Sequence, residues 1–201
     1  MKRCLRISLL TVSSVAALAV VSLCSWDSQA SEMSVAGKSI WLRGHIVAGD
    51  QDRFRDLIAS ARSISTVHLD SPGGDIYSAG EIARQIRLAG LSTVVDASRQ
   101  VCASSCTIIF VGGVKRIYLN ADRVGGLSTG RGFKGLGFHE ATYPGQSGTG
   151  NVSSAATALM ISLYGELGVP AAGGLVAQAP PQLIYGVSAE TALKLGIATS
   201  R

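Results

Sequence analysis

The sequence has few charged and few aromatic residues. Of its 201 residues, 15% are charged and 5% are aromatic, whereas 47% are hydrophobic. Disorder over most of the chain is therefore excluded, because disordered chains combine low hydrophobicity with high net charge. The 24 glycines follow no G-X-Y period, which excludes collagen. A protein with several membrane spans is excluded as well, because the sequence contains one long apolar run.

That apolar run covers residues 7–24 and follows a basic head at residues 1–6. Together with the small residues that end at Ala30, it predicts a secretory signal peptide over residues 1–30, cut after Ala30. The body of the protein, residues 31–201, is then one domain that is periplasmic or secreted. The run is just long enough to span a bilayer, so an uncleaved membrane anchor is the alternative.

Loss of residues 1–30 lowers the net charge from +5 to +3. The remaining basic residues are scattered and few aromatic residues accompany them, so nucleic-acid binding is not expected. Two cysteines remain, Cys102 and Cys106. In an oxidising compartment they are a disulfide candidate, provided that Cys102 lies just before a helix rather than within it. Two thiols without a nearby histidine pair do not make a zinc site.

Hydrophobic periodicity predicts strands that alternate with helices. The predicted strands are 39–46, 66–70, 92–96 and 115–119, and the predicted helices are 50–62 (capped by Asp50), 75–89, 103–111, 152–167 and 188–195. Residues 121–150 are rich in glycine and predict a long loop, with one short strand at 136–139. This alternation indicates an α/β domain with mainly parallel strands.

Two motifs in the glycine-rich segment resemble functional signatures without their context. Residues 126–130 fit G-x-S-x-G around Ser128, but the sequence that follows cannot readily start the helix that a nucleophile elbow needs. Residues 130–135 fit the dinucleotide fingerprint, but neither a strand before it nor a helix after it is predicted. Neither motif supports an active site.

Three other motifs carry chemistry that fits together. Ser71-Pro72-Gly73-Gly74 follows a strand, and paired glycines let backbone N–H groups face a cavity. The segment 102–107 (Cys-Ala-Ser-Ser-Cys-Thr) opens an apolar helix, where a serine experiences the positive helix end and the next N–H can bind an oxyanion. The segment 137–139 (Gly-Phe-His) offers a histidine, the usual base for activating a serine.

The order of these motifs along the chain resembles the proteolytic subunit of Clp protease, within the crotonase-like superfamily. Gly-Gly-Val-Lys-Arg at 112–116 and the predicted secretory signal make the chain similar to an extracytoplasmic ClpP-like group. The resemblance covers roughly residues 39–199. It implies an α/β fold, the ClpP/crotonase-like repeated ββα superhelix with mainly parallel strands.

The resemblance also implies a role for each matching residue. Ser104 matches the nucleophile and His139 the general base, while the backbone of Gly74 and of Ser105 matches the oxyanion donors. Ser105 is the second candidate for the nucleophile. His45 and His68 are poorer candidates for the base, and we expect His68 to be a side chain on the sheet.

The sequence departs from the family pattern in two places. The family has an acid before the last helix, whereas residues 179–188 contain no Asp or Glu. Glu140 or Glu166 could replace it, or a serine–histidine dyad could act alone. The second departure is the 35-residue spacing between Ser104 and His139, which is longer than in the protease itself.

These observations predict a secreted or periplasmic serine hydrolase, expected to be a peptidase that acts on peptides or unfolded chains. The alternative is a non-catalytic binding module on the same fold. An acyl-CoA enzyme of the crotonase type is disfavoured, because the compartment lacks that cofactor. No metal or organic cofactor is indicated. The resemblance implies a homo-oligomer, without the ATP-dependent unfoldase of the cytoplasmic protease. Membrane attachment is expected only if the signal is not cleaved.

Overall fold

The computed structural model describes residues 30–61, 63–143 and 151–201. The predicted signal peptide, apart from Ala30, lies outside these residues, and so does the stretch 144–150 of the glycine-rich loop. In the part of the chain that is described, no helix is long and apolar enough to cross a membrane.

The strands form two sheets. The first has the order β1-β2-β3-β4-β6 and the second the order β5-β8-β9-β7. The strands are β1 Glu32–Ala36, β2 Ser39–Arg43, β3 Thr66–Asp70, β4 Ser92–Asp96, β5 Val101–Ala103, β6 Arg116–Leu119, β7 Gly126–Ser128, β8 Gly135–Phe138 and β9 Ile184–Gly186. Strands β2, β3, β4 and β6 are parallel, as are β5 and β8, whereas β1, β7 and β9 pair with their neighbours in antiparallel fashion.

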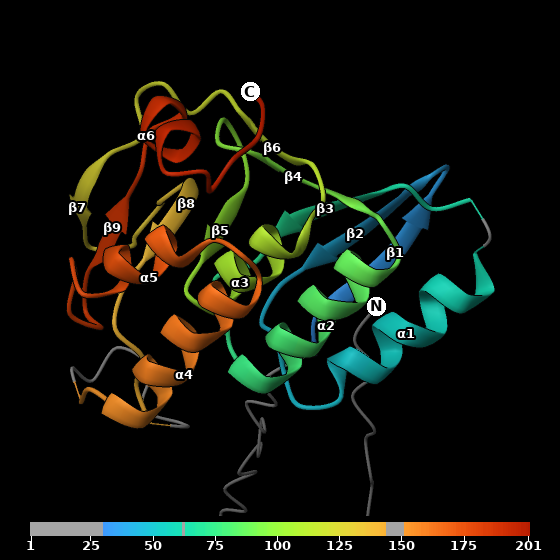
Figure 1. Cartoon of the computed structure of the whole chain (residues 1–201), viewed down its shortest axis with the longest axis horizontal. Coiled ribbons are helices and arrows are strands. Elements are labelled where there is room, and N and C mark those ends of the chain that lie inside the picture. The colour runs from blue at the N-terminus through green and yellow to red at the C-terminus, as the bar shows by residue number, and fades with distance from the viewer. Residues whose placement is uncertain (1–29, 62, 144–150) are drawn as a thin grey trace, which may run out of the picture.

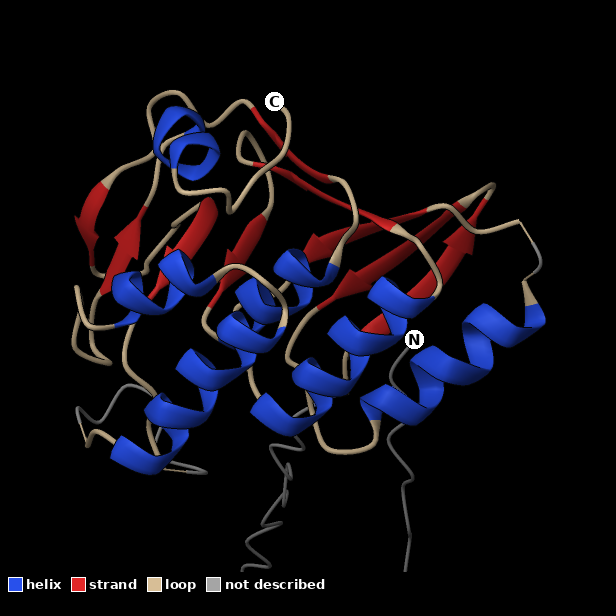
Figure 2. Cartoon of the chain, viewed as in Figure 1, coloured by secondary structure: helices blue, strands red, loops and turns tan. Residues whose placement is uncertain are grey.

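The helices lie mostly on one side of these sheets (Figure 2). They are α1 Asp50–Ser60, α2 Ile76–Leu88, α3 Ser105–Gly112, α4 Ser154–Glu166, α5 Pro170–Val176 and α6 Ala189–Lys194. Figure 1 shows α1, α2 and α3 side by side on one side of the first sheet, with α4 beside α2 and α3, and α5 packed on α4. Every residue of α3 is buried, so this helix lies in the centre of the molecule. The predicted α/β class with mainly parallel strands is confirmed.

A buried tyrosine side chain connects the two sheets. Tyr118 on β6 is fully buried, and its hydroxyl accepts a hydrogen bond from the Leu136 N–H and donates one to the Val187 carbonyl oxygen. A buried phenol needs such partners, since an unpaired hydroxyl in the core is costly. The bonds tie β6 of the first sheet to β8 of the second.

The arginine of the Gly-Gly-Val-Lys-Arg motif has a structural role. The Arg116 guanidinium donates hydrogen bonds to the carbonyl oxygens of Gly113, Gly196 and Ile197. These bonds fasten the C-terminal segment to the end of α3.

The predicted cap of the first helix is wrong. Asp50 does not cap α1, because Gly49 is the N-cap and makes no side-chain cap bond. Asp50 is the first helical residue; its carboxylate accepts a hydrogen bond from the Val47 N–H and pairs with Arg53 at 2.6 Å. The carboxylate therefore fixes the loop before the helix.

Candidate active site

The loop after β3 is held against the second sheet. Ser71 exchanges backbone hydrogen bonds with the strand β5, donating to the Val101 oxygen at 2.7 Å and accepting from the Ala103 N–H at 3.1 Å. The Ser71 hydroxyl then accepts from the Gly73 N–H at 3.1 Å. The Ser-Pro-Gly-Gly turn is therefore placed next to the segment that carries Ser104.

Ser104 occupies a sharp junction between a strand and a helix. It follows β5 directly and is the N-cap of α3, with φ 55° and ψ −131°. A non-glycine residue in this region is strained by about 1–3 kcal/mol, and such strain persists where the surroundings enforce it. A serine on a strained strand-to-helix turn is the geometry that presents a nucleophile.

Several hydrogen bonds hold Ser104 in this conformation. Its N–H donates to the Gly137 oxygen at 2.9 Å, and its carbonyl oxygen accepts from both the N–H and the hydroxyl of Thr107. The Thr107 hydroxyl in turn lies 2.5 Å from the buried Tyr164 hydroxyl. Because Thr107 donates its own proton to Ser104, Tyr164 is the donor in that contact. The backbone of Ser104 is thus fixed from three elements.

His139 lies beside Ser104 because their strands are neighbours. Strands β5 and β8 are parallel, with Ala103 in register with Gly137. Ser104 follows one strand by one residue and His139 follows the other by one residue, so both emerge at the same sheet edge. Sheet pairing therefore closes the 35-residue spacing in the sequence.

The ring of His139 is oriented by a backbone carbonyl. Nδ1 lies 2.7 Å from the carbonyl oxygen of Glu140. A carbonyl oxygen can only accept, so Nδ1 carries the proton in the neutral ring and Nε2 keeps its lone pair. Burial lowers the pKa of His139 below its ordinary value of 6.5, against a smaller opposing effect of the Glu140 hydrogen bond. The neutral, basic form therefore predominates at neutral pH.

Residues from all three sequence motifs line one cavity of about 240 Å³. Its lining comprises His45, Pro72, Gly73, Gly74, Ile76, Ser104, His139, Ala141, Thr142 and Pro181. Within the described part of the chain, the Ser104 hydroxyl has no hydrogen-bond partner, and it makes none with His139. Catalytic hydrogen bonds are often long in unliganded sites and tighten when substrate binds.

Two backbone N–H groups are free to bind an anion. The N–H of Gly74 has no hydrogen-bond partner among the described residues. The N–H of Ser105 belongs to the first turn of α3, where the helix provides no acceptor. Gly74 has φ 145°, and a Cβ there would lie 2.0 Å from the Ile46 carbonyl oxygen, so the position requires glycine.

The remaining candidates are placed differently by the structure. His45, which the sequence ranked low, lines the cavity, whereas His68 stacks on Trp41 at 4.2 Å between ring centroids and lies outside it. The end of β2 brings His45 to the cavity, a placement that no local sequence signal reveals. The Ser105 side chain is fully buried and hydrogen-bonded to Gly74, so it is not available as a nucleophile.

Glu166, a candidate for the third, acidic member, is bonded to an arginine instead. This carboxylate forms two hydrogen bonds with the Arg84 guanidinium, at 2.6 and 2.7 Å, which also lower its pKa. Neither Glu166 nor Glu140 lines the cavity; Glu140 contributes its backbone carbonyl instead. No group of three or more His, Cys, Asp or Glu side chains in the described residues could hold a metal.

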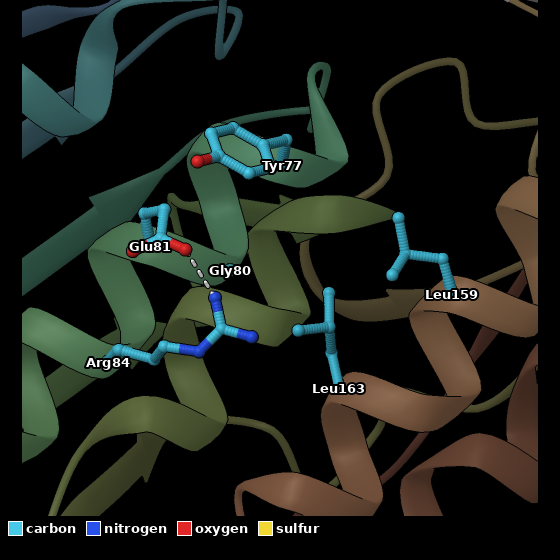
Figure 3. Close-up of a pocket in the computed structure, with 6 residues that line it drawn as sticks. All are labelled: Tyr77, Gly80, Glu81, Arg84, Leu159 and Leu163. Atoms are coloured by element: carbon cyan, nitrogen blue, oxygen red, sulfur yellow. Dashed lines mark hydrogen bonds and ion pairs between the residues drawn. The ribbon is translucent and has the colours of Figure 1, made fainter.

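A larger hollow of about 450 Å³ lies between α2 and α4 and is lined by six residues, Tyr77, Gly80, Glu81, Arg84, Leu159 and Leu163 (Figure 3). Figure 3 shows the leucines of α4 facing α2, where Arg84 pairs with Glu81. This hollow holds neither a nucleophile nor a histidine. The smaller cavity around Ser104 is therefore the candidate active site.

A disulfide bond closes a short loop of the chain that contains Ser104. Cys102 in β5 and Cys106 in α3 are bonded, with their Cα atoms 5.2 Å apart. Both side chains are buried, and the bond links the strand to the helix across the strained residue. The bridge thus restrains the turn that presents the Ser104 hydroxyl.

We expect reduction of this bridge to lower stability and reactivity together. Closing so short a loop contributes about 2 kcal/mol in the chain-entropy model, which corresponds to about 4–8 °C in Tm for a domain of this size. Melting curves and labelling of Ser104 by a serine-directed probe, with and without reductant, measure both effects. Unchanged melting and labelling, once alkylation has shown Cys102 and Cys106 to be free, would contradict the restraint.

Comparison with known proteins supports the fold assignment. No family model and no curated protein sequence matches the chain. Among solved structures, a variant of the 1510-N membrane-bound stomatin-specific protease matches with a TM-score of 0.56 and 16% identity, over 81% of this chain and 76% of that one. A second variant of that protease, in complex with a substrate peptide, matches with a TM-score of 0.54 and 16% identity, over 81% and 72%.

The ClpP protease catalytic domain from Plasmodium falciparum matches with a TM-score of 0.53 and 16% identity, over 81% of this chain and 83% of that domain. The chain therefore has the fold of ClpP-like proteases, as its motifs predict. At these identities the likeness establishes the fold, and the chemistry has to be argued from the cavity itself.

Proposed function

We propose that this protein is a serine peptidase in which Ser104 is the nucleophile and His139 the general base. One observation carries the proposal: a strained serine at a strand-to-helix junction shares a cavity with a histidine whose Nδ1 is engaged by a carbonyl. Burial keeps that histidine neutral and hence basic near neutral pH.

In the proposed reaction, the Ser104 oxygen attacks the carbonyl carbon of a peptide bond. Its proton passes to His139 Nε2, and the resulting imidazolium then protonates the leaving amine. Water hydrolyses the acyl-enzyme, with His139 again taking the proton. The Glu140 carbonyl stabilises the imidazolium and holds the ring plane, the two tasks that an acid performs in a triad.

The oxyanion of the tetrahedral intermediate is bound by the N–H groups of Gly74 and Ser105. Gly74 lines the cavity and Ser105 directly follows Ser104, which also lines it; neither N–H has a hydrogen-bond partner among the described residues. Ser105 adds the positive end of the buried helix α3. Together these groups favour the charged intermediate over the neutral substrate.

Peptides are the proposed substrates, and the compartment is proposed to lie outside the cytoplasm. The neighbouring stomatin-specific protease has been solved with a substrate peptide, which supports the substrate class. The basic head and apolar run at the N-terminus support export, with the protein periplasmic or secreted when the signal is cut and anchored in the membrane when it is not. The ClpP-like fold supports a homo-oligomer.

A fluorophosphonate probe tests the proposal directly. We expect the protein to be labelled and peptide mapping to place the adduct on Ser104. Ser128 is an internal control, because it sits in a G-x-S-x-G motif but lies in strand β7, outside the cavity, where its hydroxyl accepts from the Gly130 N–H. An adduct on Ser128 or Ser105 would assign the nucleophile elsewhere.

A non-catalytic binding module is the second candidate, favoured by the lack of an acid among the residues that line the cavity. The same experiment separates the two. A folded protein that stays unlabelled at Ser104 would support the binding module and contradict the peptidase.

A further inference from the structure

The side chain of Ser105 has a task that neither the motif nor the proposed mechanism assigns to it. Ser105 is the first residue of α3, is fully buried, and does not line the cavity. Its hydroxyl donates a hydrogen bond to the Gly74 carbonyl oxygen at 3.1 Å. The residue that offers one free N–H is therefore bonded through its side chain to the residue that offers the other.

Hydrogen bonds have to hold the backbone of Gly74 in place. It has no side chain to restrain it, and its φ of 145° is one of many conformations that glycine can adopt. On its N-terminal side, the Gly73 carbonyl oxygen accepts from the Ile46 N–H at 2.9 Å. In a trans peptide the Gly74 N–H points the opposite way, away from Ile46.

On its C-terminal side, the Gly74 carbonyl oxygen accepts from the Ser105 hydroxyl, and the Asp75 N–H of the same peptide plane donates to the Ile46 carbonyl oxygen at 2.9 Å. Ile46 thus holds both peptide planes that flank the Cα of Gly74, and the Ser105 hydroxyl adds a direct bond from Gly74 to the start of helix α3. Without the Ser105 hydroxyl, Gly74 would keep its bonds to Ile46 but lose this link to α3, so the distance between the N–H groups of Gly74 and Ser105 would be less fixed. Oxyanion stabilisation depends on donors that are already oriented before charge develops.

We propose that the Ser105 hydroxyl is a positioning group that ties Gly74 to the start of helix α3 and so sets the separation of the two oxyanion donors. The inference rests on the proposed function. It assigns the second serine of the Cys-Ala-Ser-Ser-Cys-Thr motif a role different from that of the first.

The test compares Ser105→Ala with wild type in fluorophosphonate labelling of Ser104. We expect the maximal rate of labelling, kinact, to fall about 10- to 100-fold while the half-saturating probe concentration changes less than about threefold. The loss should be smaller than that of an entire oxyanion donor, which costs about 10²- to 10³-fold in rate, because both N–H groups remain and only their separation is loosened.

Thr93→Val is the matched control for a purely structural effect. The Thr93 hydroxyl is also buried and also donates to a backbone carbonyl, that of Phe110, but it lies outside the cavity. We expect this variant to lose stability and to keep the wild-type kinact. If both variants lower kinact only in proportion to the fraction unfolded, the Ser105 hydroxyl is structural and the proposal is wrong.

A second pair of variants keeps the test valid if Ser105→Ala does not fold. Ser105→Thr and Ser105→Val have the same shape and differ in the hydroxyl donor. Faster labelling of the threonine variant by about tenfold or more supports the positioning role, and equal rates overturn it. If the wild type itself is not labelled at Ser104, the proposed peptidase fails; if it is labelled and Ser105→Ala matches it, only the positioning role fails.

Discussion

Replacing Ser104 or His139 with alanine is expected to lower kcat/KM for peptide hydrolysis by at least about 10³-fold, because a nucleophile and its base act as one unit. For the same reason, the double variant should be no slower than the worse of the two single variants. The melting temperatures should stay close to that of the wild type, since neither side chain contributes to the core.

His68→Ala is the control for this experiment, because His68 stacks on Trp41 on the first sheet and is absent from the cavity lining. Its activity should remain within about threefold of the wild type. Glu140→Ala should also stay active, since the backbone carbonyl rather than the carboxylate engages Nδ1. Loss of more than 10²-fold in Glu140→Ala would mean that an acid supports the histidine after all, whereas a His139→Ala variant at more than a tenth of the wild-type rate would remove the base from the mechanism.

The pH profile provides an independent readout of His139. The active form is the neutral ring, so kcat/KM should rise with pH through the pKa of His139 and then level off. Because burial lowers that pKa, the midpoint of the acid limb should lie below the ordinary histidine value of 6.5. The limb should be missing from the residual activity of His139→Ala. A midpoint above 6.5 would contradict the buried, neutral ring.

The sequence predicts the long, periodic elements of this fold and misses the short ones. Strands 66–70 and 92–96 and the helix around 76–88 occur as expected, because each has a clear apolar pattern and a turn at its end. Strand β5 was missed, since three apolar residues before an apolar helix show no change of period. Helix α5 contains Pro170 and paired glycines and has a low intrinsic helix propensity, so its packing on α4 has to stabilise it.

In the candidate site, too, local motifs could be predicted from the sequence, whereas contacts that depend on the fold could not. The motif residues were predictable because serine, paired glycine and histidine are chemically distinctive. The hydrogen-bond partner of His139 could not be predicted. Any residue at position 140 has a carbonyl group, and the direction of that group depends on the fold. The burial of the Ser105 hydroxyl and the position of His45 at the cavity are also long-range effects. Both arise because the segments that follow β2 and β3 pair with each other and with β5.

Gly74→Ala is expected to inactivate the protein through its backbone. A Cβ at this position would lie 2.0 Å from the Ile46 carbonyl oxygen and 2.9 Å from its nitrogen, and φ of 145° disfavours any side chain. The loop must shift, which moves the Gly74 N–H out of the cavity. We expect labelling of Ser104 to slow by about 10²-fold or more, the effect of losing one oxyanion donor.

The same substitution should reduce the free energy of unfolding by about 2 kcal/mol or more, since the new methyl group meets main-chain atoms that cannot rotate away. Gly125→Ala is the matched control, because a Cβ there meets nothing within 4 Å and its φ is not positive. That variant should match the wild type in both labelling and melting. Labelling is compared at a temperature where melting curves show both variants folded, so that a slow rate reports on the site itself. A folded Gly74→Ala protein that is labelled within threefold of the wild-type rate would show that the Gly74 N–H does not stabilise the oxyanion, and the N–H of Ser105 would then have to act without it.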